Sequence, residues 1–290
     1  MPPKVKKDPF AVEPDTVDIT VTVTGKIPRR NFENFSPFFQ VKEIYRSHLS
    51  DAQRSARHQE LYKQIQGYFN DVRTEIRLEE LQEQFKNLRF TLNPATGRKY
   101  PHVTDILYWD AEFYMNPDEL TQYGARGSAV HAMIDHWIAS KQWDKTIINK
   151  RDSILLKKGS LNLWDTLDEI NFLGFMEKHG KDIEFGEGEF QGFNEEHFYC
   201  GRLDRIGKYQ GVPAIFDWKC TASRDEFFKQ LAMYLKMDDP RLKGIQRMVI
   251  VPLNSDNKSG YGKPVVSDEP DKYFNMALRD RHDFRDKFGI

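Results

Sequence analysis

The second half of the sequence carries a run of strand-like segments that is followed by a helix and one more strand. The strand-like segments are "IEFGEGEFQGF", "EEHFYCGRLDRIGKY", a turn at "QGVP", and "AIFDWKCT". An amphipathic segment, "SRDEFFKQLAMYLKM", then leads to the strand "IQRMVIVPL" and to a closing helix, "DKYFNMALRDRHDFRDKF". Together with the helices expected before it, this order predicts an α/β core with a mixed central sheet flanked by helices.

Patterns in the first two thirds of the chain predict the remaining elements. The segments "VDITVTVTG" and "FFQVKEIY" indicate the two strands of a hairpin, and residues 50–88, which contain no Pro, indicate one long helix or two shorter ones. Apolar stripes predict helices over residues 126–141 and 162–179. Thr104 is a candidate N-cap for a further helix.

A Pro- and Gly-containing segment, "LNPATGRKYP", marks the main boundary near Asn93. We expect a mobile tail over residues 1–15, which are rich in Pro and Lys, an accessory hairpin and helix region over residues 16–92, and the core domain over residues 93–290. The accessory region has aromatic and basic side chains that could bind single-stranded nucleic acid or a partner protein. A small hydrophobic core is the commoner use of such aromatics.

Composition excludes several classes of protein and leaves others open. The 43 basic and 44 acidic side chains nearly cancel, so a nucleic-acid partner would need a local basic surface. Two cysteines, without a C-x-x-C pair, favour a reducing cytoplasm over a disulfide framework. The sequence has no apolar run long enough for a signal peptide or membrane span, and no G-x-x-x-x-G-K-[ST] for ATP.

The strand "AIFDWKCT" places charged side chains where a buried strand should be apolar. Alternation puts Ile215, Asp217 and Lys219 on one face, and Phe216 and Trp218 on the other. A hairpin partner, "CGRLDRIGKY", brings a second carboxylate, from the "GRLD" aspartate, to the neighbouring strand. Two carboxylates beside one lysine suit a hard divalent cation such as Mg²⁺, although an isolated D-x-K is most often a surface ion pair.

Other short motifs accompany this pair in a fixed order. They are "GSAVH" (residues 127–131) on a helix, two acids on the first strand (Glu187 and Glu189), "GRLD" ending at Asp204, "DWK", and "QLAMY" (residues 230–234) on the next helix. The set resembles the PD-(D/E)XK nuclease superfamily, in its RecB-type branch that includes phage and mitochondrial genome maintenance exonucleases. The resemblance covers roughly Tyr100 to Leu253 and implies a restriction-endonuclease-like core.

The resemblance implies a role for each matching residue. Mg²⁺ or Mn²⁺ would be held by two carboxylates, a backbone carbonyl, an upstream acid and a histidine at the edge of the site: Asp204, Asp217, Trp218, Glu189 and His131. Lys219 would be the catalytic lysine. Gln230 and Tyr234 would contact the nucleic-acid strand or brace the motif.

Three points about this assignment remain open in the sequence. Glu187 shares a face with Glu189, and Glu195 or Glu196 would serve as the upstream acid if the strand meander were shorter. His131 alone could simply bond to a neighbour such as Asp135. The segment "YPHVTDIL" looks like the family's "YPSVTTIL", with a His and an Asp in place of Ser and Thr.

The expected activity is Mg²⁺- or Mn²⁺-dependent hydrolysis of DNA, from single- or double-stranded ends, in recombination, repair or replication of a phage type. A DNA groove would draw on four arginines near the motifs: Arg126, Arg202, Arg205 and Arg224. The expected location is the cytoplasm, that of the host if the chain is phage-encoded, with a single-strand-binding or annealing protein as a further partner. The alternatives are a structure-specific endonuclease and a catalytically silent module that binds DNA or has a structural role.

Overall fold

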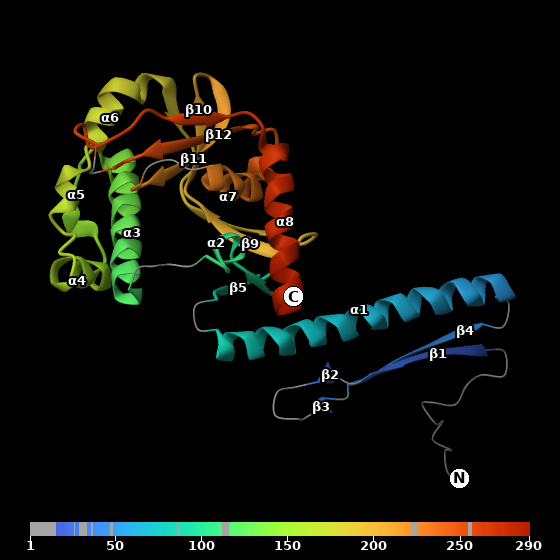
Figure 1. Ribbon diagram of the computed structural model, residues 1–290. Coiled ribbons are helices and arrows are strands. Elements are labelled where there is room, and N and C mark those ends of the chain that lie inside the picture. The colour runs from blue at the N-terminus through green and yellow to red at the C-terminus, as the bar shows by residue number, and fades with distance from the viewer. Residues whose placement is uncertain are drawn as a thin grey trace, which may run out of the picture. The chain divides into compact units, whose positions relative to one another are not determined.

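The computed structural model describes residues 16–25, 27–28, 34–35, 37–46, 49–85, 88–111, 116–221, 225–254 and 257–290. The tail expected over residues 1–15 lies outside this part of the chain. The chain divides into two compact units, residues 1–86 with Ile290 and residues 87–289 (Figure 1). The division therefore falls a few residues before the expected boundary near Asn93.

The N-terminal unit contains the predicted hairpin and one long helix. Strands β1 (Thr16–Thr24) and β4 (Phe38–Arg46) pair antiparallel, and two short strands lie between them, β2 (Ile27–Pro28) and β3 (Asn34–Phe35). Helix α1 (Asp51–Gln84) is continuous, which settles the choice between one helix and two. Ile19, Val21 and Val23 on β1 form a buried cluster with Leu61 and Ile65 on α1, so the hairpin and the helix share a small core.

The larger unit is built on a five-stranded mixed sheet. Its strand order is β13 (Val265–Ser267), β12 (Arg247–Pro252), β11 (Val212–Lys219), β10 (Arg205–Tyr209) and β7 (Ile183–Phe185). Strands β11 and β12 are parallel and the other neighbours are antiparallel. Two separate hairpins are formed by β5 (Phe90–Leu92) with β6 (Lys99–Pro101), and by β8 (Phe190–Asn194) with β9 (Tyr199–Leu203).

Helices cover both faces of this sheet (Figure 1). Those of the larger unit are α2 (Val103–Leu107), α3 (Pro117–Ser140), α4 (Lys150–Lys158), α5 (Thr166–Glu169), α6 (Phe172–His179), α7 (Asp225–Leu235) and α8 (Pro270–Phe288). Single 3₁₀ turns span Lys145–Ile147, Gly180–Asp182 and Pro240–Leu242. The mixed α/β sheet flanked by helices that the sequence predicts is therefore present. In the described residues, no helix is long and apolar enough to cross a membrane.

Four details of the helices differ from the sequence prediction. Helix α3 begins at Pro117, well before the expected residue 126. The helix expected over residues 162–179 is interrupted, because the Asn171 side chain accepts a hydrogen bond from Gly174 N and starts α6 afresh. Thr104 is not an N-cap, since α2 begins directly after His102. Helix α4 was not predicted from the sequence at all.

The two faces of the central strand β11 enter different hydrophobic layers. Phe216 and Trp218 stack on each other and belong to a buried cluster with residues of α3, α4, α5 and α6. Ile215 is also fully buried but lies outside that cluster, on the side of the sheet that α7 contacts. Alternation along β11 thus holds, and it fixes the face on which Asp217 and Lys219 lie.

Candidate functional site

A tight hairpin sets Asp204 beside Asp217. The turn between β10 and β11 consists of Gln210 and Gly211, both with positive φ (53° and 75°), as a type I′ hairpin requires. Arg205 pairs with Phe216 in this register, so Asp204, the residue before β10, comes next to Asp217. The predicted convergence of the two carboxylates on neighbouring strands is confirmed.

His131, from the middle of α3, joins this pair. Its Nδ1 lies 3.2 Å from Asp204 Oδ1, and its Nε2 lies 2.9 Å from the carbonyl oxygen of Trp218. The N–H of Trp218 also donates to Asp204 Oδ2 over 3.2 Å. The histidine therefore contacts two of the expected metal ligands, and it does not bond to Asp135, the alternative that the sequence left open.

Lys219 is held by a chain of polar contacts that reaches α7. Its Nζ lies 2.7 Å from Asp217 Oδ2 and donates to Gln230 Oε1 over 3.1 Å. Gln230 Nε2 in turn donates to the hydroxyl of Tyr234 over 2.7 Å. Gln230 and Tyr234 are both buried, and these hydrogen bonds fit the bracing role, while a contact with a nucleic-acid strand stays a prediction.

Burial and close charges shift the pKa of each ionisable group here. Burial lowers the pKa of His131, but the Asp204 carboxylate outweighs it and the pKa rises to about 9. Burial raises the pKa of Asp217, and the charge of Asp204 adds to the rise although Lys219 opposes it. Burial also acts to raise the pKa of Asp204, yet His131 holds it below its usual range. Two cationic side chains thus hold together two carboxylates that would otherwise repel each other.

The oxygen atoms of this cluster suit a hard divalent cation. Asp217 supplies a buried carboxylate and Asp204 a partly buried one, with side chains 4% and 13% exposed, and Trp218 supplies a backbone carbonyl. Asp217 Oδ2 has no hydrogen bond of good geometry, even though Lys219 is close. Over the described ranges, no group of three or more His, Cys, Asp or Glu residues is arranged to hold a metal ion. A cation here would therefore depend on the backbone carbonyl as well as on side chains.

The structure does not bring the candidate upstream acids into the cluster. Glu189, just before β8, pairs with Arg202 at 2.6 Å, and Glu187 pairs with Arg241 at 2.6 Å. Glu195 accepts hydrogen bonds from Tyr100 and Asn93. In the described residues each of these two glutamates is paired with an arginine and not with a residue of the cluster, so the choice between them stays a prediction.

The arginines expected to line a DNA groove occupy different environments. Arg205 is buried, with a side chain 8% exposed, and its guanidinium binds Asp135 on α3 and the carbonyl of Gly186. Arg126 is also buried, whereas Arg202 is exposed and paired with Glu189. Arg224 lies outside the described residues. Arg205 therefore joins β10 to α3 inside the domain, and its guanidinium is occupied by these contacts.

One arginine near the site was missed from the sequence. Arg89 bonds to Asp105 through both its backbone N–H and its guanidinium (2.6 Å each), and to the hydroxyl of Thr104. Its charge also acts on Tyr234, at the end of the chain that holds Lys219. The signal that could have revealed it is Asp105 itself, because an acid at a position where the motif that this segment resembles has Thr calls for a base nearby. His102, the other departure, lies 2.7 Å from the hydroxyl of Thr91.

Substituting Gly201 tests how tightly Tyr234 is packed. A Cβ at Gly201, on β9, would come within 2.3 Å of Tyr234 Cε1, so we expect Gly201→Ala to lower the free energy of unfolding by about 1–3 kcal/mol. Gly192 is its cross-strand partner, where a Cβ would meet only the flexible side chain of Met237, and Gly192→Ala is the matched control with a smaller cost. Urea denaturation measures both; equal costs would contradict the close packing of Tyr234.

Comparison with known proteins adds little to this geometry. No protein-family model matches the chain, and no curated protein matches it. A solved structure titled "Crystal structure of SSO0001" matches with a TM-score of 0.31 and 15% sequence identity, over 74% of this chain and 86% of that chain. A likeness this low carries no argument about fold or activity.

Proposed function

We propose that the chain is a metal-dependent nuclease of the PD-(D/E)XK superfamily that hydrolyses DNA, with a preference for DNA ends. One observation carries the proposal: Asp204 and Asp217 lie on neighbouring strands with Lys219 on the same face, and His131 contacts Asp204 from α3. Motifs far apart in the sequence thus meet in one partly buried cluster. The end preference, the RecB-type branch and a role in recombination or repair rest on the sequence resemblance.

Each residue has a chemical role in this proposal. The carboxylates of Asp204 and Asp217 and the carbonyl of Trp218 would hold Mg²⁺ or Mn²⁺, and His131 would fix the orientation of Asp204. The cation, when bound, would supply positive charge to the phosphate and lower the pKa of water. Lys219, with its ammonium held by Asp217 and Gln230, would donate a hydrogen bond to a phosphate oxygen or to the attacking water.

Lys219→Ala tests the proposal directly. We expect wild type to degrade end-labelled linear DNA in Mg²⁺ or Mn²⁺, and the variant to be slower by roughly 10²–10³-fold, because a donor aimed at the reacting phosphate is lost. Lys229→Ala, on α7, is the matched control: it removes a lysine paired with Asp280 at 2.9 Å, and we expect near wild-type activity.

Three results would contradict the proposal or parts of it. Equal activity of Lys219→Ala and wild type would mean that the cluster is not the catalytic site. Cleavage of closed circular DNA would rule out a requirement for ends while leaving the nuclease activity in place. Absence of hydrolysis of any DNA by wild type would favour the silent binding module.

A further inference from the structure

Helix α4 presents a basic surface around one exposed apolar side chain. Lys150, Arg151, Lys157 and Lys158 each lie three or four residues from Ile154, so all four lie close to it on the helix surface. Ile154 is 47% exposed, while Leu156 faces the core of the domain. We call these four residues the α4 basic face.

The α4 basic face differs from other charged surfaces of the domain in lacking acidic partners. In the part of the chain that the structure describes, none of its four side chains forms an ion pair with a carboxylate, and only Lys157 has a ring contact, 4.0 Å above Trp164. Many other bases of the domain are paired, for example Lys145 with Asp168 and Lys229 with Asp280. The nine residues of α4 carry these four bases and one acid, Asp152, and this excess of positive charge favours a polyanionic partner.

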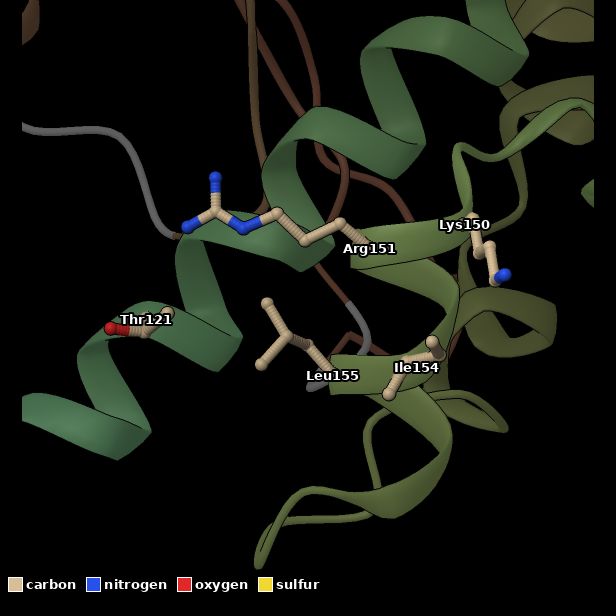
Figure 2. Close-up of a pocket in the computed structure, with 5 residues that line it drawn as sticks. All are labelled: Thr121, Lys150, Arg151, Ile154 and Leu155. Atoms are coloured by element: carbon tan, nitrogen blue, oxygen red, sulfur yellow. The ribbon is translucent and has the colours of Figure 1, made fainter.

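An open groove lies between this face and α3 (Figure 2). It has a volume of about 540 Å³ and is lined by Thr121 on α3 and by Lys150, Arg151, Ile154 and Leu155 on α4. Figure 2 shows Thr121 across from Leu155, with the Arg151 side chain extended toward α3. None of these five lining residues is aromatic, so they offer charge and apolar side chains but no ring on which bases could stack.

Helix α3 connects this groove to the candidate catalytic cluster. Thr121 lies ten residues before His131 on the same helix, which corresponds to about 15 Å along its axis. Successive base pairs of a DNA duplex rise about 3.4 Å, so the separation corresponds to roughly four base-pair steps. Ten residues also turn the helix by roughly 1000°, so the two side chains lie about 80° apart around it, and a strand that contacts both would have to run along α3 and partly around it.

We propose that the α4 basic face binds the phosphate backbone of DNA a few nucleotides away from the scissile bond. The inference rests on the proposed nuclease function and adds to it a second contact that is independent of sequence, because phosphates are common to all sequences. An acidic protein segment would satisfy the same charges. The position on α3, within reach of the cluster, favours the DNA that the cluster would hold.

The test is the salt dependence of DNA binding by Lys150→Gln/Arg151→Gln. In a Lys219→Ala background with Mg²⁺, we expect affinity for a short labelled duplex to fall roughly threefold to tenfold. The slope of log affinity against log salt should shrink by about 1.8, or 0.9 per lost phosphate contact, equally for two unrelated sequences. With Lys219 restored, KM for DNA should rise while kcat stays unchanged.

The control is Lys208→Gln/Lys236→Gln, which changes the net charge equally but removes bases that are paired with Glu184 and Asp271. We expect less than a twofold change in affinity.

An unchanged salt slope in Lys150→Gln/Arg151→Gln would overturn the inference, even where wild type cleaves DNA. Weaker binding of an acidic peptide with unchanged DNA binding would overturn it too, in favour of a protein partner. Failure of the nuclease proposal would show separately, as absence of hydrolysis by wild type.

Discussion

Asp217→Asn is expected to abolish metal-dependent hydrolysis while the protein stays folded. The substitution keeps the shape of the side chain but removes one of the two carboxylate charges that would attract the cation, so we expect a fall of at least about 10³-fold in the rate of DNA hydrolysis. Folding should tolerate it, because burial and the charge of Asp204 already raise the pKa of Asp217 and so disfavour its ionised form. Lys219 would keep its hydrogen bond to Gln230.

Thermal unfolding with and without Mn²⁺ separates a loss of cation binding from a loss of folding. A ligand at a hundred times its dissociation constant stabilises the folded state by about 2.7 kcal/mol, so wild type should gain Tm on addition of Mn²⁺ and Asp217→Asn should not. Asp280→Asn is the matched control, since it also neutralises an aspartate paired with a lysine, Lys229, away from the cluster. If Asp217→Asn kept the Mn²⁺-dependent gain, the cation would have to bind elsewhere.

The pairing of Asp204 with Asp217 could be predicted because it depends only on local rules. A strand alternates its side chains between two faces, and a two-residue turn such as Gln210–Gly211 fixes which residues of two strands lie opposite each other. The spacing of Gln230 and Tyr234 also follows from one helical turn. These rules hold whatever the rest of the domain does.

The partners of the charged side chains could not be predicted, because they depend on elements far apart in the sequence. Arg205 looks like a surface base next to a motif, yet it is buried by packing against α3 and needs Asp135 as its counter-charge. Glu189 meets Arg202 only because β8 and β9 pair in a register that sets Gln191 opposite Arg202. A long charged side chain can reach several neighbours, and the periodicity of the sequence does not identify the one with which it pairs.

The failure to predict helix α4 from the sequence has a different cause. Its sequence, "KRDSILLKK", has one fully buried residue, Leu156, so its apolar periodicity is weak. The start signal is the Asn149 side chain, which accepts a hydrogen bond from Asp152 N. Packing against α3 supplies the rest of its stability, and that contribution is not visible in the sequence.

Phe172→Ala is expected to have the largest effect on stability. Phe172, on α6, is 1% exposed, and its ring lies 5.2 Å from that of Trp137 on α3 and 5.8 Å from that of Trp218 on β11. Trp143 stacks on it at 5.6 Å. Because removing a fully buried ring leaves a cavity among large neighbours, we expect the free energy of unfolding to fall by about 3–5 kcal/mol.

Tryptophan fluorescence during urea denaturation measures this loss. It reports on the larger structural unit, because all five tryptophans lie within residues 87–289. Leu173→Ala is the matched control: the neighbouring side chain is 48% exposed, and we expect a change within about 0.5 kcal/mol. We expect the geometry of the candidate site to be disturbed as well, because the Phe172 ring lies between α3, which carries His131, and β11, which carries Asp217. A cost below about 1 kcal/mol would mean that α3 and β11 are not held together through this ring.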